Sequence, residues 1–305
     1  MSVLGSPDKT GDYVSPTTGH GARPPVDNEY REAELDGSAR KRRTSGTTIA
    51  ERLSAVSTFA FPFVVLVAIW ALVAAAGLYP NYIFPSPVEV GRTVIRTLGD
   101  GSLLRHVAAS LFRLGLGFAA GCAIGFPLAV LIGINRTASR FFVPLITFFN
   151  SIPGLAWIPL AILWFGIDYK AVTFIIFNSV FFPVAFSTVA GIRGVPQSLI
   201  NAALCLGAGH KVLIQEVYIP GALPSIVTGM RLGVGYGWRA LIGGEMIATS
   251  SGLGFMIFDA RQTLESDVVV LGMVAMGALY LTMDRLVLRP LEARTIERWG
   301  TVRSD

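Results

Sequence analysis

Two side chains of opposite charge, Arg239 and Glu245, stand inside one apolar stretch of this sequence. A charge within a bilayer is costly, so it usually faces water or a partner and often marks the path of an ion or solute. Glu245 follows Arg239 by about 240° around a helix, so the two cannot pair on one face. Each needs a partner elsewhere. Arg239 is a candidate for attracting anions, and Glu245 is a candidate for anchoring neighbouring helices.

The stretch from Asn150 to Pro159 is a second place where a solute could pass. Proline removes a backbone donor and weakens a helix, and broken backbone at membrane depth is tolerated where it lines a cavity or is covered by protein. Asn178, in the next apolar stretch, is a polar residue that could meet either charge. The candidate pathway-lining residues are therefore Ser151, Pro153, Trp157, Asn178, Arg239 and Glu245.

Catalytic chemistry is not indicated by the sequence. The histidines and cysteines are scattered along the chain: His20, His106, His210, Cys122 and Cys205. They form no CxxC pair or metal-ligand set, and the sequence contains no G-x-x-x-x-G-K-[ST] phosphate loop. We therefore expect no catalytic residue, no metal site and no cofactor bound by this chain, and we expect that the chain is not an enzyme.

The composition indicates a membrane protein. Hydrophobic residues make up 52% of the 305 and charged residues 15%, against about 25% charged residues in soluble proteins. The net charge of +5 could suggest nucleic-acid binding. The Lys and Arg residues flank apolar stretches, however, which is the pattern of membrane topology.

Six apolar stretches are long enough to cross a bilayer, which takes about 20 residues. They are Thr58–Leu78, Ser110–Ile134, Phe141–Phe165, Ala171–Ala190, Pro224–Ala248 and Val268–Leu288. The third contains Pro144, Pro153 and Pro159, and we expect it to be broken there. The sequence thus predicts an all-α membrane protein with six transmembrane helices.

Basic residues alternate between the two sides of these spans. One side receives the cluster 40–43, Arg136, Arg140, Arg193, Lys211 and the arginines of 285–303. The other side receives Arg92, Arg96, Lys170 and Arg261. The positive-inside rule therefore places both termini and the loop 191–223 in the cytoplasm. Outside, the sequence Pro85-Ser86-Pro87 opens a predicted short interfacial helix before the second span.

The chain divides into three parts by composition. Residues 1–50 are rich in Gly, Pro, Ser, Thr and charge, so we expect a disordered cytoplasmic tail. Residues 51–290 form the transmembrane domain, and residues 291–305 form a cytoplasmic C-terminal tail. Arg42-Arg43 before an apolar run leaves a twin-arginine export signal as an alternative, although that run is longer than the apolar core of a signal peptide.

Glycines recur at every fourth position in the second and fifth spans. They are Gly117, Gly121 and Gly125 in one, and Gly229, Gly233 and Gly237 in the other. Such stripes let helix backbones approach closely. We expect close helix packing, and the alternatives are the wall of a passage or a contact between two copies of the chain.

Residues 195–224 form a polar, glycine-containing loop between the fourth and fifth spans. Gly207 allows a tight bend between two short helices. An apolar face suited to docking in a groove is formed by Leu204, Leu206, Val212, Leu213 and Val217. Pro220 and Pro224 are expected to end the second short helix before the fifth span.

This loop resembles the cytoplasmic EAA coupling loop of permeases of ATP-binding-cassette (ABC) importers. Ala202 and Ala203 match its Ala-Ala pair, Gly207 its glycine and Pro220 its final proline, while Asn201 replaces the usual Glu. The resemblance implies that the ATPase-coupling residues are Asn201, Ala202, Ala203, Leu206, Gly207, Ala208, Leu213, Val217, Ile219 and Pro220.

The resemblance extends over most of the chain beyond the N-terminal tail. Residues 156–167, 243–248, 250–254 and 259–261 are similar to permeases for nitrate, sulfonates and taurine. This implies the type I importer fold in the plasma membrane of a prokaryote, a permease homodimer, a separate dimeric ABC ATPase that binds ATP and Mg, and an extracytoplasmic solute-binding protein. The implied cargo is a small anionic solute such as an aliphatic sulfonate, taurine or nitrate.

An ion-gradient-driven secondary transporter is the alternative. Such transporters usually show inverted repeats and more spans, and neither is visible in this sequence. ATP-dependent transport with a partner chain distinguishes the two functions.

Overall fold

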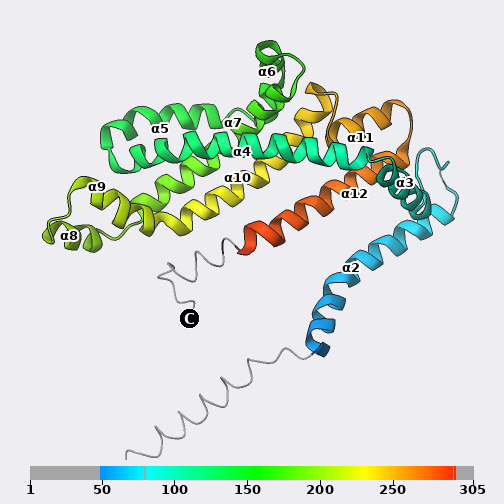
Figure 1. Ribbon diagram of the computed structural model, residues 1–305, viewed down its shortest axis with the longest axis horizontal. Coiled ribbons are helices and arrows are strands. Elements are labelled where there is room, and N and C mark those ends of the chain that lie inside the picture. The colour runs from blue at the N-terminus through cyan, green and yellow to red at the C-terminus, as the bar shows by residue number, and fades with distance from the viewer. Residues whose placement is uncertain (1–48, 79, 291, 293–305) are drawn as a thin grey trace, which may run out of the picture. The chain divides into compact units, whose positions relative to one another are not determined.

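The computed structural model describes residues 49–78, 80–290 and 292, and among these it contains helices and no strand (Figure 1). Almost all of the predicted tails, 1–50 and 291–305, lies outside the described residues. The chain divides into two units, Met1–Val65 and Leu66–Asp305. The packing of helices described below is that of the second unit, and the helix Ile49–Ala75 runs from the first unit into it.

Long apolar helices alternate with short helices and turns along the chain. They are α2 (Ile49–Ala75), α3 (Pro87–Gly99), α4 (Ser102–Ile134), α5 (Arg136–Asn150), the 3₁₀ turn η1 (Gly154–Trp157), α6 (Ile158–Phe165), α7 (Tyr169–Arg193), α8 (Gln197–Cys205), α9 (His210–Val212), the π-helical turn η2 (Leu213–Tyr218), α10 (Ile219–Ala248), α11 (Leu253–Gln262), α12 (Ser266–Met283) and the π-helical turn η3 (Asp284–Leu288).

Four helices of the described part are long and apolar enough to cross a membrane. They are Ser102–Ile134, Tyr169–Arg193, His210–Ala248 and Ser266–Leu288, and they confirm the second, fourth, fifth and sixth predicted spans as helices. The bent pair α5 with η1–α6 raises the number to five if it is one span. The first predicted span overlaps α2, a helix of 27 residues, in which the apolar stretch Phe61–Ala75 is by itself shorter than a span. The described residues therefore give four or five spans where the sequence predicted six.

The third predicted span, Phe141–Phe165, is not a straight helix. Its two halves meet at an angle of 86°, and the break falls between Asn150 and Gly154. Pro153 marks this break, as expected. Pro144 lies inside α5 and Pro159 lies in the first turn of α6. A proline in a first turn removes an N–H that has no partner in the helix, so Pro159 begins a helix and does not break one.

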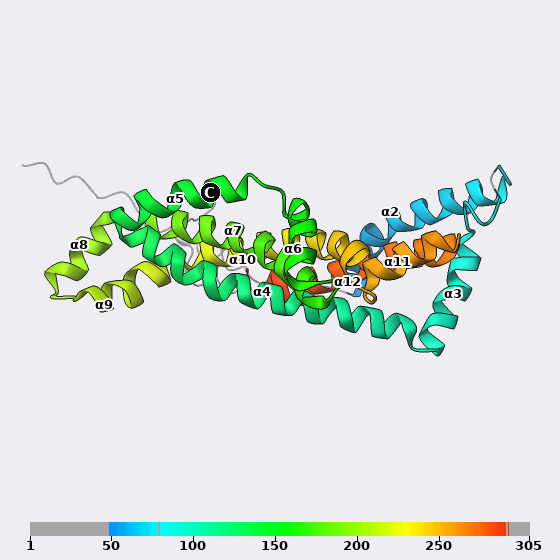
Figure 2. The ribbon, with the colours of Figure 1, turned by 90° about the horizontal axis from the view of Figure 1, so that it is seen from above.

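Helix α7 packs against both α4 and α10, and the three helices run side by side (Figures 1 and 2). Both glycine stripes face α7. A Cβ atom added to Gly121 of α4 would lie 2.8 Å from Val180 Cγ1, and one added to Gly237 of α10 would lie 2.9 Å from Val180 Cγ2. Val180 has no exposed surface. The glycines thus serve close helix packing, which confirms the first of the interpretations offered above.

Different short helices lie at the two ends of the second unit. Helices α8 and α9 lie at one end, and α3 and α11 lie at the other (Figure 1). The predicted helix after Pro85 is present as α3, with Ser86 as its N-cap. The Ser86 hydroxyl accepts from the Glu89 N–H, and the Glu89 carboxylate accepts from the Ser86 N–H, which is a capping box. Helix α11 was not predicted from the sequence.

Pro220 and Pro224 do not end a helix, contrary to the sequence prediction. Residues His210–Ala248 form one continuous helix of 39 residues. The π-helical turn η2 immediately precedes Pro220. Prolines are tolerated in such helices where local π-helical adjustments satisfy the freed backbone groups. The helix of the fifth span therefore begins inside the loop 195–224. The sequence prediction had placed a helix end between this loop and the span.

Candidate functional site

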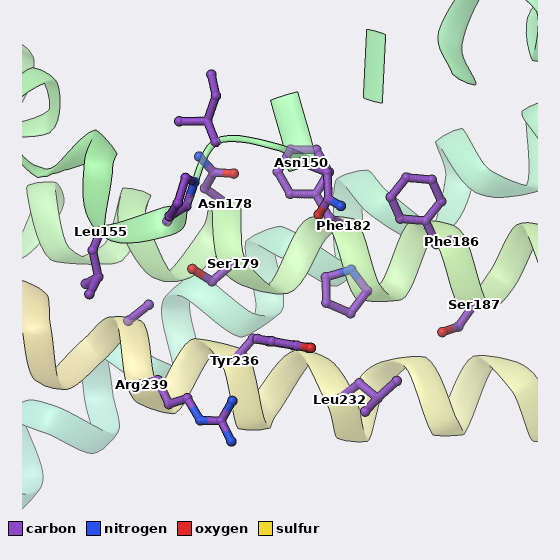
Figure 3. A pocket seen from close by; sticks show the side chains of 15 residues that line it. Asn150, Leu155, Asn178, Ser179, Phe182, Phe186, Ser187, Leu232, Tyr236 and Arg239 are labelled. Carbon is purple, nitrogen blue, oxygen red and sulfur yellow. The ribbon is translucent and has the colours of Figure 1, made fainter. Parts of the chain in front are cut away.

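A cavity of about 510 Å³ opens between the α5–η1 break, α7 and α10 (Figure 3). The helix break brings Asn150 and Pro153 to one wall, and α7 and α10 form the others. The polar side chains that line it are Asn150, Asn178, Ser179, Ser187, Tyr236 and Arg239. None of the described residues that line this cavity is acidic.

Arg239 supplies the positive charge of this cavity. It lies on α10, is exposed, and forms no ion pair with a described residue. Its guanidinium carbon lies 5.8 Å from the centroid of the Tyr236 ring, which is a cation–π geometry. Figure 3 shows both side chains on α10, across the cavity from Asn178. The cavity therefore presents a cation without a counter-ion in the described part of the chain.

Asn178 lies between this cavity and a smaller one. The second cavity, of about 230 Å³, is lined by aromatic rings that include Phe149, Trp157 and Phe174. Asn178 is buried and lines both cavities. The Trp157 ring lies 6.1 Å from the Phe149 ring and 6.2 Å from the Phe174 ring, and its buried Nε1 has no hydrogen-bond partner among the described residues. The side-chain amide of Asn178 and the indole N–H of Trp157 thus both lie at the smaller cavity, where a solute could bind them.

The structure brings together only part of the predicted pathway set. Pro153, Asn178 and Arg239 line the larger cavity, and Trp157 lines the adjoining one. Ser151 caps the end of α5, and its hydroxyl donates to the Thr147 carbonyl over 2.9 Å. It lines neither cavity.

Glu245 lies outside both cavities and has no exposed surface. Its carboxylate accepts hydrogen bonds from Arg113 Nη1 at 2.7 Å, from the Ser110 hydroxyl at 2.8 Å and from the Gly254 N–H at 3.0 Å. Arg113 also donates to the Ser251 carbonyl at 2.8 Å. The pair joins α4, α10 and the start of α11, so Glu245 is placed as an anchor between helices.

Arg113 is the partner that the sequence analysis missed. It stands inside the second predicted span, as Glu245 stands inside the fifth. A charged residue within a span usually pairs with another, so opposite charges in two spans were the available signal. The sequence did not reveal that Arg113 and Glu245 pair, because 132 residues separate them.

The loop 195–224 folds as the predicted bend between two helices. Gly207 adopts a φ of +82° between α8 and α9, a conformation that residues with a side chain rarely adopt. The predicted apolar face is divided. Leu213 packs inward with Val195 and Ile200, while Leu204, Leu206 and Val212 are exposed. The Asn201 side chain accepts a hydrogen bond from Gln197 at 3.0 Å.

Residues 121–289, more than half of the chain, match the family described as "Binding-protein-dependent transport system inner membrane component". The matched region contains both cavities and the loop 195–224. The chain belongs to this permease family.

Named relatives of the permease are similar over most of its length. The taurine transport system permease protein TauC of Escherichia coli is 37% identical over 78% of this chain and 88% of the relative. The putative aliphatic sulfonates transport permease protein SsuC of Bacillus subtilis is 34% identical over 77% and 84%. The bicarbonate transport system permease protein CmpB of Synechococcus elongatus is 34% identical over 62% and 68%.

Solved structures show the fold of the permease. Chains of the MetNI methionine ABC transporter in inward-facing conformations match with TM-scores of 0.50 and 0.51, at 22% and 21% identity, over 62% of this chain and 95% and 96% of theirs. This places the permease in the type I importer fold, as an inner-membrane component that crosses the membrane several times. Among its described residues, no group of three or more His, Cys, Asp or Glu could hold a metal ion.

Proposed function

We propose that this permease forms the translocation pathway of an ABC importer for a small anionic solute such as taurine, another sulfonate or nitrate. The observation that carries this proposal is Arg239, an exposed cation on a membrane-spanning helix at a cavity whose described lining has no acid. An arginine offers a planar fork of donors that fits an oxyanion. The relatives are named for taurine, sulfonates and bicarbonate, whose anionic groups are all oxyanions.

The pathway is completed by a second copy of the permease. Arg239 and Tyr236 are exposed on a helix long and apolar enough to span the bilayer, where an uncovered charge is costly. A homodimer that faces these two side chains inward encloses the cavity and keeps it wet. The remaining candidate pathway residues, Ser151, Pro153, Trp157 and Asn178, then lie along or next to that space.

Energy comes from a separate dimeric ABC ATPase, which binds ATP and Mg and contacts the loop 195–224. The exposed Leu204, Leu206 and Val212 offer an apolar surface for a groove on the ATPase. ATP binding then shifts the permease between inward-open and outward-open states, because the nucleotide favours one of them. Solute arrives from an extracytoplasmic binding protein, and both permease termini lie in the cytoplasm.

The coupling part is tested by co-purification of the ATPase with two matched variants. Gly207→Val forces a side chain into a φ of +82°, whereas Gly209→Val alters a neighbouring glycine whose φ is −77° and whose Cβ position is also open. We expect the first variant to lose the ATPase and the second to keep it. Equal retention by both variants contradicts the assignment of this loop.

The solute part is tested by uptake of labelled taurine or nitrate into vesicles that contain permease, ATPase and binding protein. Loss of one charge-assisted contact costs about 1.5–3 kcal/mol, so Arg239→Gln should weaken apparent solute affinity by about tenfold to a hundredfold. Arg92→Gln, at an exposed arginine of α3, is the control. Uptake that follows an ion gradient without ATP would instead identify a secondary transporter.

A further inference from the structure

A basic cavity lies at the end of the molecule that carries α8 and α9. It has a volume of about 480 Å³, within the range of small-molecule sites, and lies between the end of α4, the start of α5, the end of α7 and α8. Its lining includes Arg136, Arg140 and Arg193 together with the buried side chains of Ile132 and Ile192. No described residue that lines it is acidic.

The three arginines have no counter-ion in the described part of the chain. None of them forms an ion pair there. Arg193 Nη2 donates to the Ser139 hydroxyl at 2.6 Å, which leaves its other donors available. Guanidinium groups bind phosphate oxygens through paired hydrogen bonds, so this cavity fits a phosphate-bearing anion.

A mostly apolar cavity adjoins the basic one, and Asn135, Arg136 and His210 are the polar residues of its lining. It has a volume of about 450 Å³ and follows the last turns of α4 along Pro127, Val130 and Leu131. The two cavities share Ile134 and Arg136. Because α4 is long and apolar enough to span the membrane and ends at Ile134, a bilayer around α4 would bring its headgroups close to this end of the helix.

We propose that these two cavities bind one anionic phospholipid. Its phosphate lies between Arg136, Arg140 and Arg193, and one acyl chain follows α4 past Leu131. A free phosphate would occupy only the basic cavity, so the adjoining, mostly apolar cavity favours the lipid. Basic cavities between membrane helices are suited to such headgroups.

The lipid touches the same loop that is proposed to contact the ATPase. Gln197, Ile200 and Tyr218 line the basic cavity, and His210 and Ile214 line the apolar one. The lipid therefore bridges the ends of α4 and α7 to both helices of the bend. Anionic lipid in this place holds the bend against the membrane surface.

The test measures lipid binding to the full-length permease in detergent by native mass spectrometry. Phosphatidylglycerol and phosphatidylcholine are titrated onto delipidated protein, with inorganic phosphate as a separate arm. The site variant is Arg136→Gln/Arg140→Gln/Arg193→Gln. The control changes three exposed arginines elsewhere, Arg92→Gln/Arg105→Gln/Arg261→Gln.

We expect phosphatidylglycerol to bind the wild type and the control alike, and the site variant at least about tenfold more weakly, since each basic residue near an anionic lipid contributes severalfold. Phosphatidylcholine should bind all three weakly. Unchanged phosphatidylglycerol affinity in the site variant overturns the proposal.

A third variant distinguishes binding of a lipid from binding of free phosphate. Leu131→Asn places an amide in the apolar cavity, at a residue that is 47% exposed. It should weaken phosphatidylglycerol binding and leave phosphate binding unchanged. The proposal is also overturned if Leu131→Asn leaves lipid affinity unchanged.

Discussion

Removing one member of the Arg113–Glu245 pair should destabilise the permease strongly. Glu245 has no exposed surface, and the Arg113 side chain is only 6% exposed. Glu245→Leu leaves the guanidinium buried without its counter-ion and leaves the Ser110 hydroxyl and the Gly254 N–H without their acceptor. Breaking a buried pair in this way costs about 3–5 kcal/mol.

The double variant Arg113→Met/Glu245→Leu should cost less than the two single changes added together. It removes both charges, and apolar side chains then fill the space, which is often close to neutral. The coupling free energy between the two sites should therefore reach about 2–3 kcal/mol, at the upper end for residues in contact.

The assay is reversible unfolding of the purified permease in detergent by SDS or urea, followed by tryptophan fluorescence or circular dichroism. Arg96→Ala is the control, since Arg96 is 62% exposed and lies 4.0 Å from Asp267, and such surface pairs contribute at most about 1 kcal/mol. Additive costs of the single variants, within about 0.5 kcal/mol, would refute the view that this buried pair acts as a unit.

Further predictions concern packing and capping. Gly121→Ala should destabilise the fold by about 1–3 kcal/mol, because its Cβ would meet Val180 at 2.8 Å, whereas Gly115→Ala on the same helix meets nothing within 4 Å and should be neutral or stabilising; the same unfolding assay separates them. Ser86→Ala should cost about 1 kcal/mol by opening the capping box of α3, and hydrogen exchange should rise in its first turn, with no increase in α7.

Apolar length predicted the ends of the spans well. The C-terminal ends at Ile134, Ala248 and Leu288 agree with the sequence prediction, because each apolar run stops where the helix or its π-helical extension stops. The start of α4 at Ser102 was missed, since the polar residues Arg105 and His106 occupy its first turns and carry no apolar signal.

Features that depend on distant contacts could not be predicted in the same way. The glycine spacing predicted close packing, but it did not reveal that Val180 serves both stripes. The angle at Pro153 and the continuity through Pro220 depend on how the neighbouring turns satisfy backbone groups. Arg239 was a candidate from its type and position alone, because a charge in an apolar run is visible without knowing the fold.

The helix His210–Ala248 is continuous, so it joins the second half of the loop 195–224 to the fifth span in one rigid element. These two segments were predicted from the sequence to be separate helices. The 39 residues of the continuous helix span roughly 58 Å at 1.5 Å per residue. One end adjoins the Gly207 bend, and the other adjoins the Glu245 anchor. If this helix stays straight, a tilt of about 5° at the Gly207 bend would move its Ala248 end by roughly 5 Å. Because the Glu245 end is tied to α4 and α11, a displacement at the α8–α9 end would also load those contacts, and Arg239, far along the helix, would move with it.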